Sequence, residues 1–332
     1  MKLLKTLIAT TALVGAATFA SAQANPAVIF DLGGKFDKSF NEMSYTGAER
    51  FTADTGITYR EFELQSDAQR EQALRRFAQA GNNPVVVAGF SNATAMAAVA
   101  PDFPDTDFVI IDMVVDAPNV RSVVFAEHEG SFLVGLLAGM ASETGTVSFV
   151  GGMDIPLIRK FQCGYTQGAR AANPDITVLA TMTGTDGSAW NNPVKGGELT
   201  MSQIENGSDV VFAAAGGTGR GVLQAATDAD IYAIGVDANQ NYMHPGNMLT
   251  SMLKRVDVAV YDAFNDVNNG EFTAGIQVMG LAEEGVGWAL DENNESLITD
   301  EMRAAVAAAS AAIIAGEIVV HDYMSDNACP VE

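Results

Sequence analysis

Residues 31–41 read Asp-Leu-Gly-Gly-Lys-Phe-Asp-Lys-Ser-Phe-Asn, and they indicate how the chain begins to fold. They follow an apolar run at 27–30 and lead directly into a helical pattern at 42–51. A strand, a glycine turn and a helix start place such a segment at the carboxyl edge of a parallel sheet. Open α/β folds bind ligands at that edge, so the segment predicts a binding loop.

The groups in this turn suit a small polar ligand with an aromatic part. Asp31 and Asp37 can accept hydrogen bonds from hydroxyl groups, and Asn41 can both donate and accept. Phe40 offers a flat face for stacking. A phosphate is a poor fit, because the glycine pair lacks a dinucleotide fingerprint and the aspartates would repel it. The alternative is a plain turn in which Asp37 caps the helix and Phe40 is buried.

The amino terminus is typical of an exported protein. Lys2 and Lys5 precede an apolar stretch at 7–19, and Ala-Ser-Ala at 20–22 fits a cleavage site. The sequence therefore predicts a signal peptide over residues 1–22 and a freely soluble periplasmic protein after cleavage. Because the residue directly after the predicted cleavage site is Gln23 and not a cysteine, we expect the protein not to be lipid-anchored.

Charge and cysteine content narrow the class of partner. The formal net charge of −23 argues against nucleic acid, because phosphate contacts need lysine and arginine. The two cysteines, Cys163 and Cys329, predict one disulfide in an exported chain. Neither lies in a metal-binding motif, and the three histidines are scattered, so we expect no metal and no cofactor.

Short apolar runs alternate with helical patterns along the chain, which predicts parallel sheets covered by helices on both faces. The strand candidates are 27–30, 58–64, 84–89, 107–112, 121–125, 146–150, 177–182, 209–214, 231–236 and 248–253. The pattern restarts near residue 145, where a second apolar strand ends in Gly-Gly. Two such series predict two similar lobes with a ligand in the cleft between them.

Polar or flexible residues stand where several of these strands end, as a site at the sheet edge predicts. They are Phe90, Asp112, Gly216, Gly217, Asp237 and Lys254, and a loop before residue 193 adds Trp190. Each has a structural alternative. Asp112 could be a cap, the glycines a tight turn, Trp190 a packing residue and Lys254 a solvated cation. The grouping at strand ends favours a binding site.

Six motifs, taken in this order, resemble the basic membrane protein family of bacterial ABC-transporter substrate-binding proteins. They are the segment at 31–41, Glu127-His-Glu-Gly-Ser-Phe-Leu-Val-Gly-Leu-Leu-Ala-Gly139, Gly151-Gly-Met-Asp-Ile-Pro156, Gly235-Val-Asp-Ala-Asn-Gln240, Leu249-Thr-Ser-Met-Leu-Lys254 and Gly285-Val-Gly-Trp-Ala-Leu290. The resemblance covers essentially the whole mature chain.

The resemblance implies a type I periplasmic-binding fold, with two Rossmann-like lobes joined by three crossovers. Together with the restart of the strand–helix series, it places the crossings near Ala126, Thr250 and Glu271. The expected amino-terminal lobe is then 26–126 plus 250–270, and the expected carboxyl-terminal lobe is 127–249 plus 271–332.

The resemblance also implies a purine nucleoside as ligand, held between two aromatic rings. Phe40 matches one ring position, and Trp190 stands where the family usually has phenylalanine. Residues matching the ribose contacts are Asp31, Asp237 and Lys254, and those matching the base edge are Asn41 and Asp112.

The implied function is a receptor without catalysis, a monomer that delivers purine nucleosides to a membrane ABC permease. Two alternatives stay open. A sugar receptor of the same fold would keep the aromatic ring and the hydroxyl contacts. A nucleoside-cleaving enzyme would need a metal-binding cluster or a nucleophile with an adjacent base.

Overall fold

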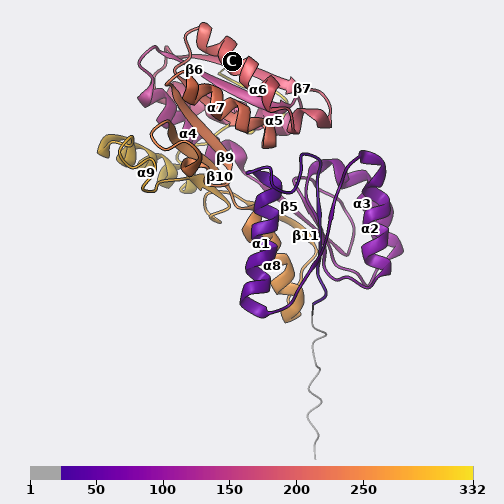
Figure 1. The fold of residues 1–332 in the computed structure, drawn as a ribbon. Coiled ribbons are helices and arrows are strands. Elements are labelled where there is room, and N and C mark those ends of the chain that lie inside the picture. The colour runs from indigo at the N-terminus through magenta and orange to yellow at the C-terminus, as the bar shows by residue number, and fades with distance from the viewer. Residues whose placement is uncertain (1–23, 332) are drawn as a thin grey trace, which may run out of the picture.

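The computed structural model describes residues 24–331, so the predicted signal peptide at 1–22 lies outside the described residues. The described chain forms two α/β lobes, each built around a six-stranded sheet (Figure 1). The predicted fold class, with two lobes and mostly parallel strands, is confirmed. No helix in residues 24–331 is both long and apolar enough to cross a membrane.

The first lobe holds an entirely parallel sheet in the order β11-β5-β4-β3-β1-β2. Its strands are β1 (Ala27–Phe30), β2 (Arg60–Glu63), β3 (Val85–Val87), β4 (Phe108–Ile111), β5 (Val120–Phe125) and β11 (Gly275–Met279). Helices α1 (Phe40–Thr55) and α8 (Val256–Asn269) lie side by side on one face. Helices α2 (Arg70–Gln79) and α3 (Ala93–Val99) cover the other (Figure 1). The central strands are buried on both faces, as their valine and isoleucine runs predict.

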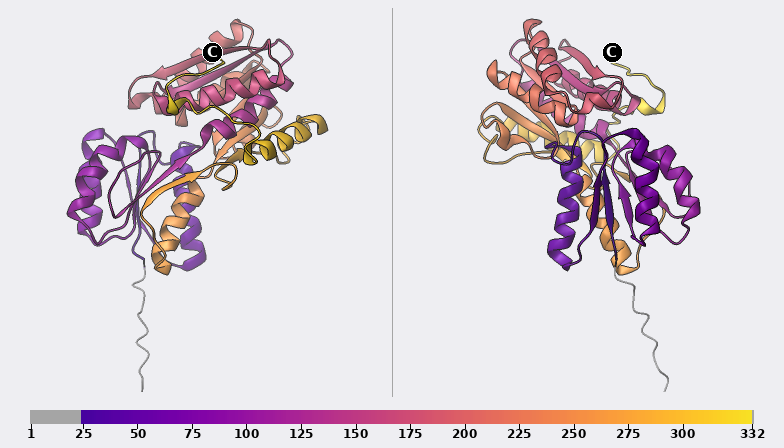
Figure 2. Two further views of the ribbon diagram at one scale, coloured as in Figure 1. Left: turned by 180° about the vertical axis from the view of Figure 1, so that it is seen from behind. Right: turned by 45° about the vertical axis from the view of Figure 1, so that its right-hand side comes forward.

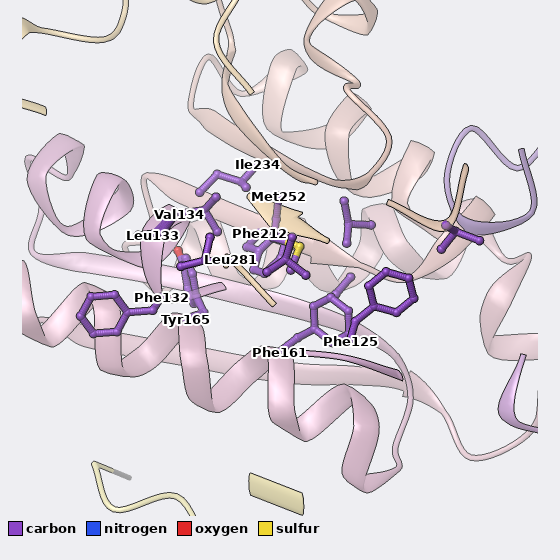
Figure 3. Close-up of a cluster of buried hydrophobic side chains, with 14 of the residues drawn as sticks. Phe125, Phe132, Leu133, Val134, Phe161, Tyr165, Phe212, Ile234, Met252 and Leu281 are labelled. Atoms are coloured by element: carbon purple, nitrogen blue, oxygen red, sulfur yellow. The ribbon is translucent and has the colours of Figure 1, made fainter. Parts of the chain in front are cut away.

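The second lobe repeats this plan in the order β12-β10-β9-β8-β6-β7. Its strands are β6 (Thr146–Met153), β7 (Thr177–Gly184), β8 (Val210–Ala214), β9 (Tyr232–Asp237), β10 (Met248–Lys254) and the antiparallel β12 (Val286–Trp288). Its helices are α4 (Glu127–Ala141), α5 (Pro156–Ala172), α6 (Pro193–Glu205), α7 (Gly219–Asp228) and α9 (Asp300–Ile314). Apolar side chains of α4 and α5 pack onto the sheet and form a core that reaches Phe125 beside the first crossing (Figure 3).

Three short segments connect the lobes and form the hinge. The first follows β5, the second follows β10, and the third runs from β11 to β12 (Figure 2). They are bonded to one another, because Ala126 N donates to the Met279 carbonyl at 3.1 Å and Arg255 N donates to the Gly285 carbonyl at 2.8 Å. The three crossovers therefore run side by side.

Two of the expected lobe boundaries are displaced. The crossing expected near Thr250 follows Lys254, because β10 pairs with β9 along its whole length in the second sheet. The crossing expected near Glu271 follows Met279, because β11 pairs with β5 in the first sheet. Strand β11 was missed because four of its five residues are exposed, so it has no buried apolar run.

The predicted disulfide is present between Cys163 and Cys329. It joins α5 to the tail that follows α9. Next to it, Gln167 Nε2 donates to the His321 carbonyl at 3.0 Å, and His321 N donates back to Gln167 Oε1 at 2.8 Å. The tail is thereby fixed against α5.

Candidate binding site

A cavity lies between the lobes, where the carboxyl ends of both sheets meet. It contains about 620 Å³ of space not filled by atoms, counting its opening to solvent. Most of the predicted site residues line it, namely Asp31, Phe40, Asn41, Phe90, Asp112, Trp190, Gly216, Asp237 and Lys254. The remaining one, Gly217, is buried beside the backbone of Trp190 and does not line the cavity.

The loop at 31–41 is held in shape by Asp37. Its carboxylate accepts from the backbone N–H groups of Ser39, Asn41 and Glu42, at 2.8, 3.1 and 3.2 Å. Asp37 therefore caps the start of α1, as the alternative interpretation of the turn predicted. Burial raises the pKa of this carboxyl to about 6, although the three N–H groups act against the rise.

Asn41 uses both of its polar atoms inside the same loop. Its Oδ1 accepts from Asp31 N at 2.9 Å. Its Nδ2 donates to the Asp31 carbonyl and to Asp37 Oδ2, each at 3.3 Å. Asn41 lines the cavity, but in this structure its amide shapes the loop and would have to exchange one of these bonds to meet a ligand.

Asp31 is paired with a cation that the sequence analysis missed. Arg70, the first residue of α2, places Nη1 2.6 Å from Asp31 Oδ1, and the Leu32 N–H donates to the same oxygen at 2.8 Å. Asp31 Oδ2 lies where a side chain on residue 89 would point, so a Cβ on Gly89 would overlap it. Burial raises the pKa of Asp31, while Arg70 opposes the rise.

Asp112 and Asp237 occupy matching positions in the two lobes. Asp112 follows β4, and Asp237 is the last residue of β9. Both have a positive φ, 73° and 63°, a backbone conformation that aspartate tolerates better than most residues. The same turn at the same sheet edge brings one carboxylate from each lobe to the cavity.

Lys254 lies against Asp112 and Glu127 and is almost fully buried. Its Nζ is 2.7 Å from Asp112 and 2.9 Å from Glu127 Oε1, and its side chain is only 2% exposed. Three ring centroids lie within 5.0–5.6 Å of Nζ, those of Phe40, Phe125 and Phe161. Lys254 is therefore a buried ion-pair partner and not a solvated cation.

Burial favours the neutral form of the carboxyl groups in the cavity, whereas Lys254 favours the ionised form. Burial raises the pKa of Asp112 and of Asp237 to about 6 each, and Lys254 limits both rises. For Glu127, burial also acts to raise the pKa, but the combined attraction of Lys254 and Lys160 lowers it to about 2. Glu127 is therefore ionised at neutral pH. Burial alone would lower the pKa of Lys254, yet the carboxylates around it raise that pKa overall, so Lys254 is charged.

Four aromatic rings contribute to the walls of the cavity. Phe40 begins α1, Phe90 begins the short helix η2 (Phe90–Asn92), Phe161 lies within α5, and Trp190 ends the short helix η4 (Gly187–Trp190). Phe40 and Phe90 belong to the first lobe, whereas Phe161 and Trp190 belong to the second. The six-membered ring of Trp190 rests against Gly152, where any side chain would overlap it.

The lobes are bridged across this cavity. The Ser39 hydroxyl, from the first lobe, donates a short hydrogen bond to the Asp237 carboxylate of the second. Gln240 Nε2 donates to the Lys38 carbonyl at 2.8 Å. With the pair between Lys254 and Asp112, these contacts hold the lobes in a closed arrangement.

Sequence reasoning missed Arg70, Glu127 and Ser39 as parts of the site. Arg70 lies in an ordinary amphipathic helix pattern, so nothing in its surroundings marks it. Ser39 lies inside the quoted loop, and Glu127 begins one of the quoted motifs, so both could have been found as polar residues next to a predicted crossing or turn. Within residues 24–331, no group of three histidine, cysteine or acidic residues is placed to hold a metal ion.

Comparison with known proteins identifies the family. The profile of the PnrA-like ABC transporter substrate-binding proteins (Bmp) matches residues 24–323. The nucleoside-binding protein BmpA of an ABC transporter from Lactococcus lactis is 32% identical over 319 residues, covering 89% of this chain and 88% of that protein. The crystal structure of an ABC transporter solute-binding protein from Aeropyrum pernix superposes with a TM-score of 0.83 at 30% identity. It covers 90% of this chain and 94% of that one.

One expectation is overturned by these comparisons. An uncharacterized lipoprotein of Pyrococcus horikoshii is 36% identical over 282 residues, covering 80% of this chain and 69% of the relative. Relatives in two further Pyrococcus species are also named lipoproteins. The expectation that the protein is not lipid-anchored rested only on the position of the cysteines in the sequence, and these names contradict it.

The family match covers most of the described chain, and the fold and the relatives agree with it. The resemblance seen in the six motifs is confirmed: the chain belongs to the Bmp family of PnrA-like ABC transporter substrate-binding proteins.

Proposed function

We propose that this substrate-binding protein binds purine nucleosides in the cavity between its lobes and delivers them to a membrane permease. The observation that carries the proposal is the make-up of the cavity, which combines aromatic rings from both lobes with buried carboxylates around one buried lysine. A purine offers two flat faces to the rings, and a ribose offers hydroxyl donors to the carboxylates. The name of the Lactococcus lactis relative, a nucleoside-binding protein, supports the same ligand class.

Phe40 and Trp190 hold the base in this proposal. Because the two rings come from different lobes, both can contact the same base only when the lobes are closed. Stacking of a base on an aromatic side chain contributes about 1–3 kcal/mol and tolerates any purine. Phe90 and Phe161 provide further apolar walls.

Asp31, Asp237 and Lys254 hold the ribose. The Ser39 hydroxyl donates to the Asp237 carboxylate, and a ribose hydroxyl could donate the same kind of hydrogen bond to it. Buried carboxylates discriminate sharply, because a ligand that lacks the matching hydroxyl leaves them unpaired. Asp112 meets the base edge or a hydroxyl close to Lys254, and Asn41 acts by shaping the loop.

Two other functions make different predictions for the same cavity. A sugar receptor would use the carboxylates and one ring, and would bind free pentoses or hexoses in preference to nucleosides. A nucleoside-cleaving enzyme would release free base. Asp31 lies against Arg70, and Asp37 caps a helix, so neither carboxylate is placed as a general base next to a nucleophile.

A ligand screen tests the proposal. The purified protein is heated with adenosine, guanosine, inosine, the free bases, ribose or hexoses, and incubated mixtures are analysed for free base. We expect nucleosides to raise the melting temperature most and to be recovered intact. A larger shift with free sugars, or release of base, would contradict the proposal.

A further inference from the structure

Glu127 is a buried carboxylate at the hinge that has no place in the ligand contacts proposed above. It begins α4, immediately after the first crossing, and its side chain is 1% exposed. Lys254 ends β10, immediately before the second crossing. The ion pair between them, with Nζ 2.9 Å from Oε1, therefore joins two of the three hinge segments.

The other carboxylate oxygen of Glu127 is held from the second lobe. Lys160, on α5, lies with Nζ 3.0 Å from Glu127 Oε2. The same ammonium donates to the Phe125 carbonyl at 2.7 Å and lies 3.5 Å from Asp322 in the disulfide-bound tail. Glu127 is thus fixed between two lysines, and its position does not depend on the cavity.

Lys254, in contrast, is shared between the hinge and the cavity. Besides Glu127, its ammonium contacts Asp112 of the first lobe at 2.7 Å. The charged groups that face it are Asp112 beyond β4, Glu127 on α4, Asp237 on β9 and, more distantly, Lys160 on α5. Because aromatic rings enclose the ammonium, these charges act on one another with little screening by water.

We propose that Glu127 is a positioning residue of the cleft. By holding Lys254 at the hinge, it limits the positive charge that reaches Asp112 and Asp237, and so sets the pH range in which the cleft binds a ligand through its hydroxyl groups. The ligand part of this inference rests on the proposed function, whereas the effect on the carboxylates does not.

The direction of the effect follows from the signs of the charges. The negative charge of Glu127 raises the pKa of Asp112 and of Asp237. In Glu127→Gln this contribution is absent, and the Lys254 ammonium can move closer to the carboxylates of Asp112 and Asp237. Both carboxyls then stay ionised to lower pH. Lys160→Gln has the opposite effect, because Glu127 keeps its charge but loses one of its two cations and attracts Lys254 more strongly.

The test measures the carboxyl pKa values directly, by NMR of the protein labelled with carbon-13 at aspartate carboxyls and without ligand. Asp112→Asn and Asp237→Asn assign the two signals. We expect midpoints near 6 in the wild-type protein. Glu127→Gln should lower them by about 0.5–1 unit and Lys160→Gln should raise them. Glu129→Gln is the matched control, because it removes a charge from the same helical turn and keeps an acceptor for the Leu281 N–H.

A calorimetric titration with guanosine between pH 4.5 and 7.5 tests the ligand part. The pH at which affinity falls to half should be lower in Glu127→Gln and higher in Lys160→Gln, and unchanged in Glu129→Gln. If the carboxyl midpoints in Glu127→Gln and in Lys160→Gln both match the wild-type values, the inference is wrong. If the midpoints shift as expected but guanosine and the other nucleosides fail to bind, the proposed function is wrong and the role of Glu127 in the charge distribution stands.

Discussion

The packing of the Trp190 indole against Gly152 gives the sharpest test of the proposed aromatic contact. A Cβ built on Gly152 would lie 2.5 Å from Trp190 Cε3 and 2.9 Å from Cη2, and closer still to Cζ3. The backbone of Gly152 is extended within β6, so alanine itself is compatible with the strand. Since carbon atoms pack at about 3.5 Å or more, the indole of Gly152→Ala must move by about 1 Å or more. It can move only toward the cavity or out of it.

Either movement spoils the proposed stack on the base. We therefore expect Gly152→Ala to weaken the binding of purine nucleosides. The loss should reach at most the whole stacking contribution of about 1–3 kcal/mol, which raises the dissociation constant by about 5- to 150-fold. Trp190→Ala should cost a similar amount. In the double variant the costs should not add, because the added methyl group has no indole left to displace.

Calorimetric titration of the two single variants and the double variant with one nucleoside measures this cycle. Gly287→Ala is the matched control, because a Cβ there meets no atom within 4 Å. The reasoning is refuted if Gly152→Ala binds like the wild-type protein, or if it costs as much in the Trp190→Ala background as in the wild type.

Three further predictions follow from the described contacts. Arg70→Met should lower the free energy of unfolding, measured in urea, by about 3–5 kcal/mol, because it leaves the buried Asp31 carboxylate unpaired. The control Arg75→Met, on the surface of the same helix, should lower it by less than about 1 kcal/mol. Equal losses in the two variants would contradict this prediction. Replacing both Cys163 and Cys329 with alanine should lower the free energy of unfolding by as much as about 5 kcal/mol, because the disulfide closes a loop of 166 residues and so limits the entropy of the unfolded chain. An unchanged melting temperature would show that the tail is held without the disulfide. The pKa of Asp237 is raised from 3.8 to about 6 on folding, so its favourable contribution is full below about pH 4 and is lost as the pH rises through 6. The stability of the wild type relative to Asp237→Asn should therefore increase as the pH is lowered from 7 to 5, and a constant difference in urea unfolding would contradict it.

Most of the fold could be predicted from the sequence, because each buried parallel strand appears in it as a short apolar run. Each of the ten strand candidates overlaps a strand of the structure. The two strands without such a signal were missed, since β11 is an exposed edge strand and β12 has only three residues. The omission of β11 also displaced the last expected crossing, because the chain stays in the first sheet as far as Met279.

The location of the cavity could be predicted for the same reason, since residues at the carboxyl ends of parallel strands meet at one edge. Their individual roles could not. Whether Asp37 caps a helix or faces a ligand depends on backbone geometry that composition does not reveal. The partners Arg70 and Glu127 come from elements distant in sequence, and only the packed structure brings them to Asp31 and Lys254.

The central claim is that a purine nucleoside lies between Phe40 and Trp190 with its ribose at Asp237 and Lys254. A crystal structure of the protein grown with guanosine or inosine tests it most directly. The account predicts density for the base between the two rings and for a ribose hydroxyl within hydrogen-bonding distance of the Asp237 carboxylate, in place of the Ser39 hydroxyl. Density for the nucleoside elsewhere, or in the cavity with the base away from both rings, would contradict it.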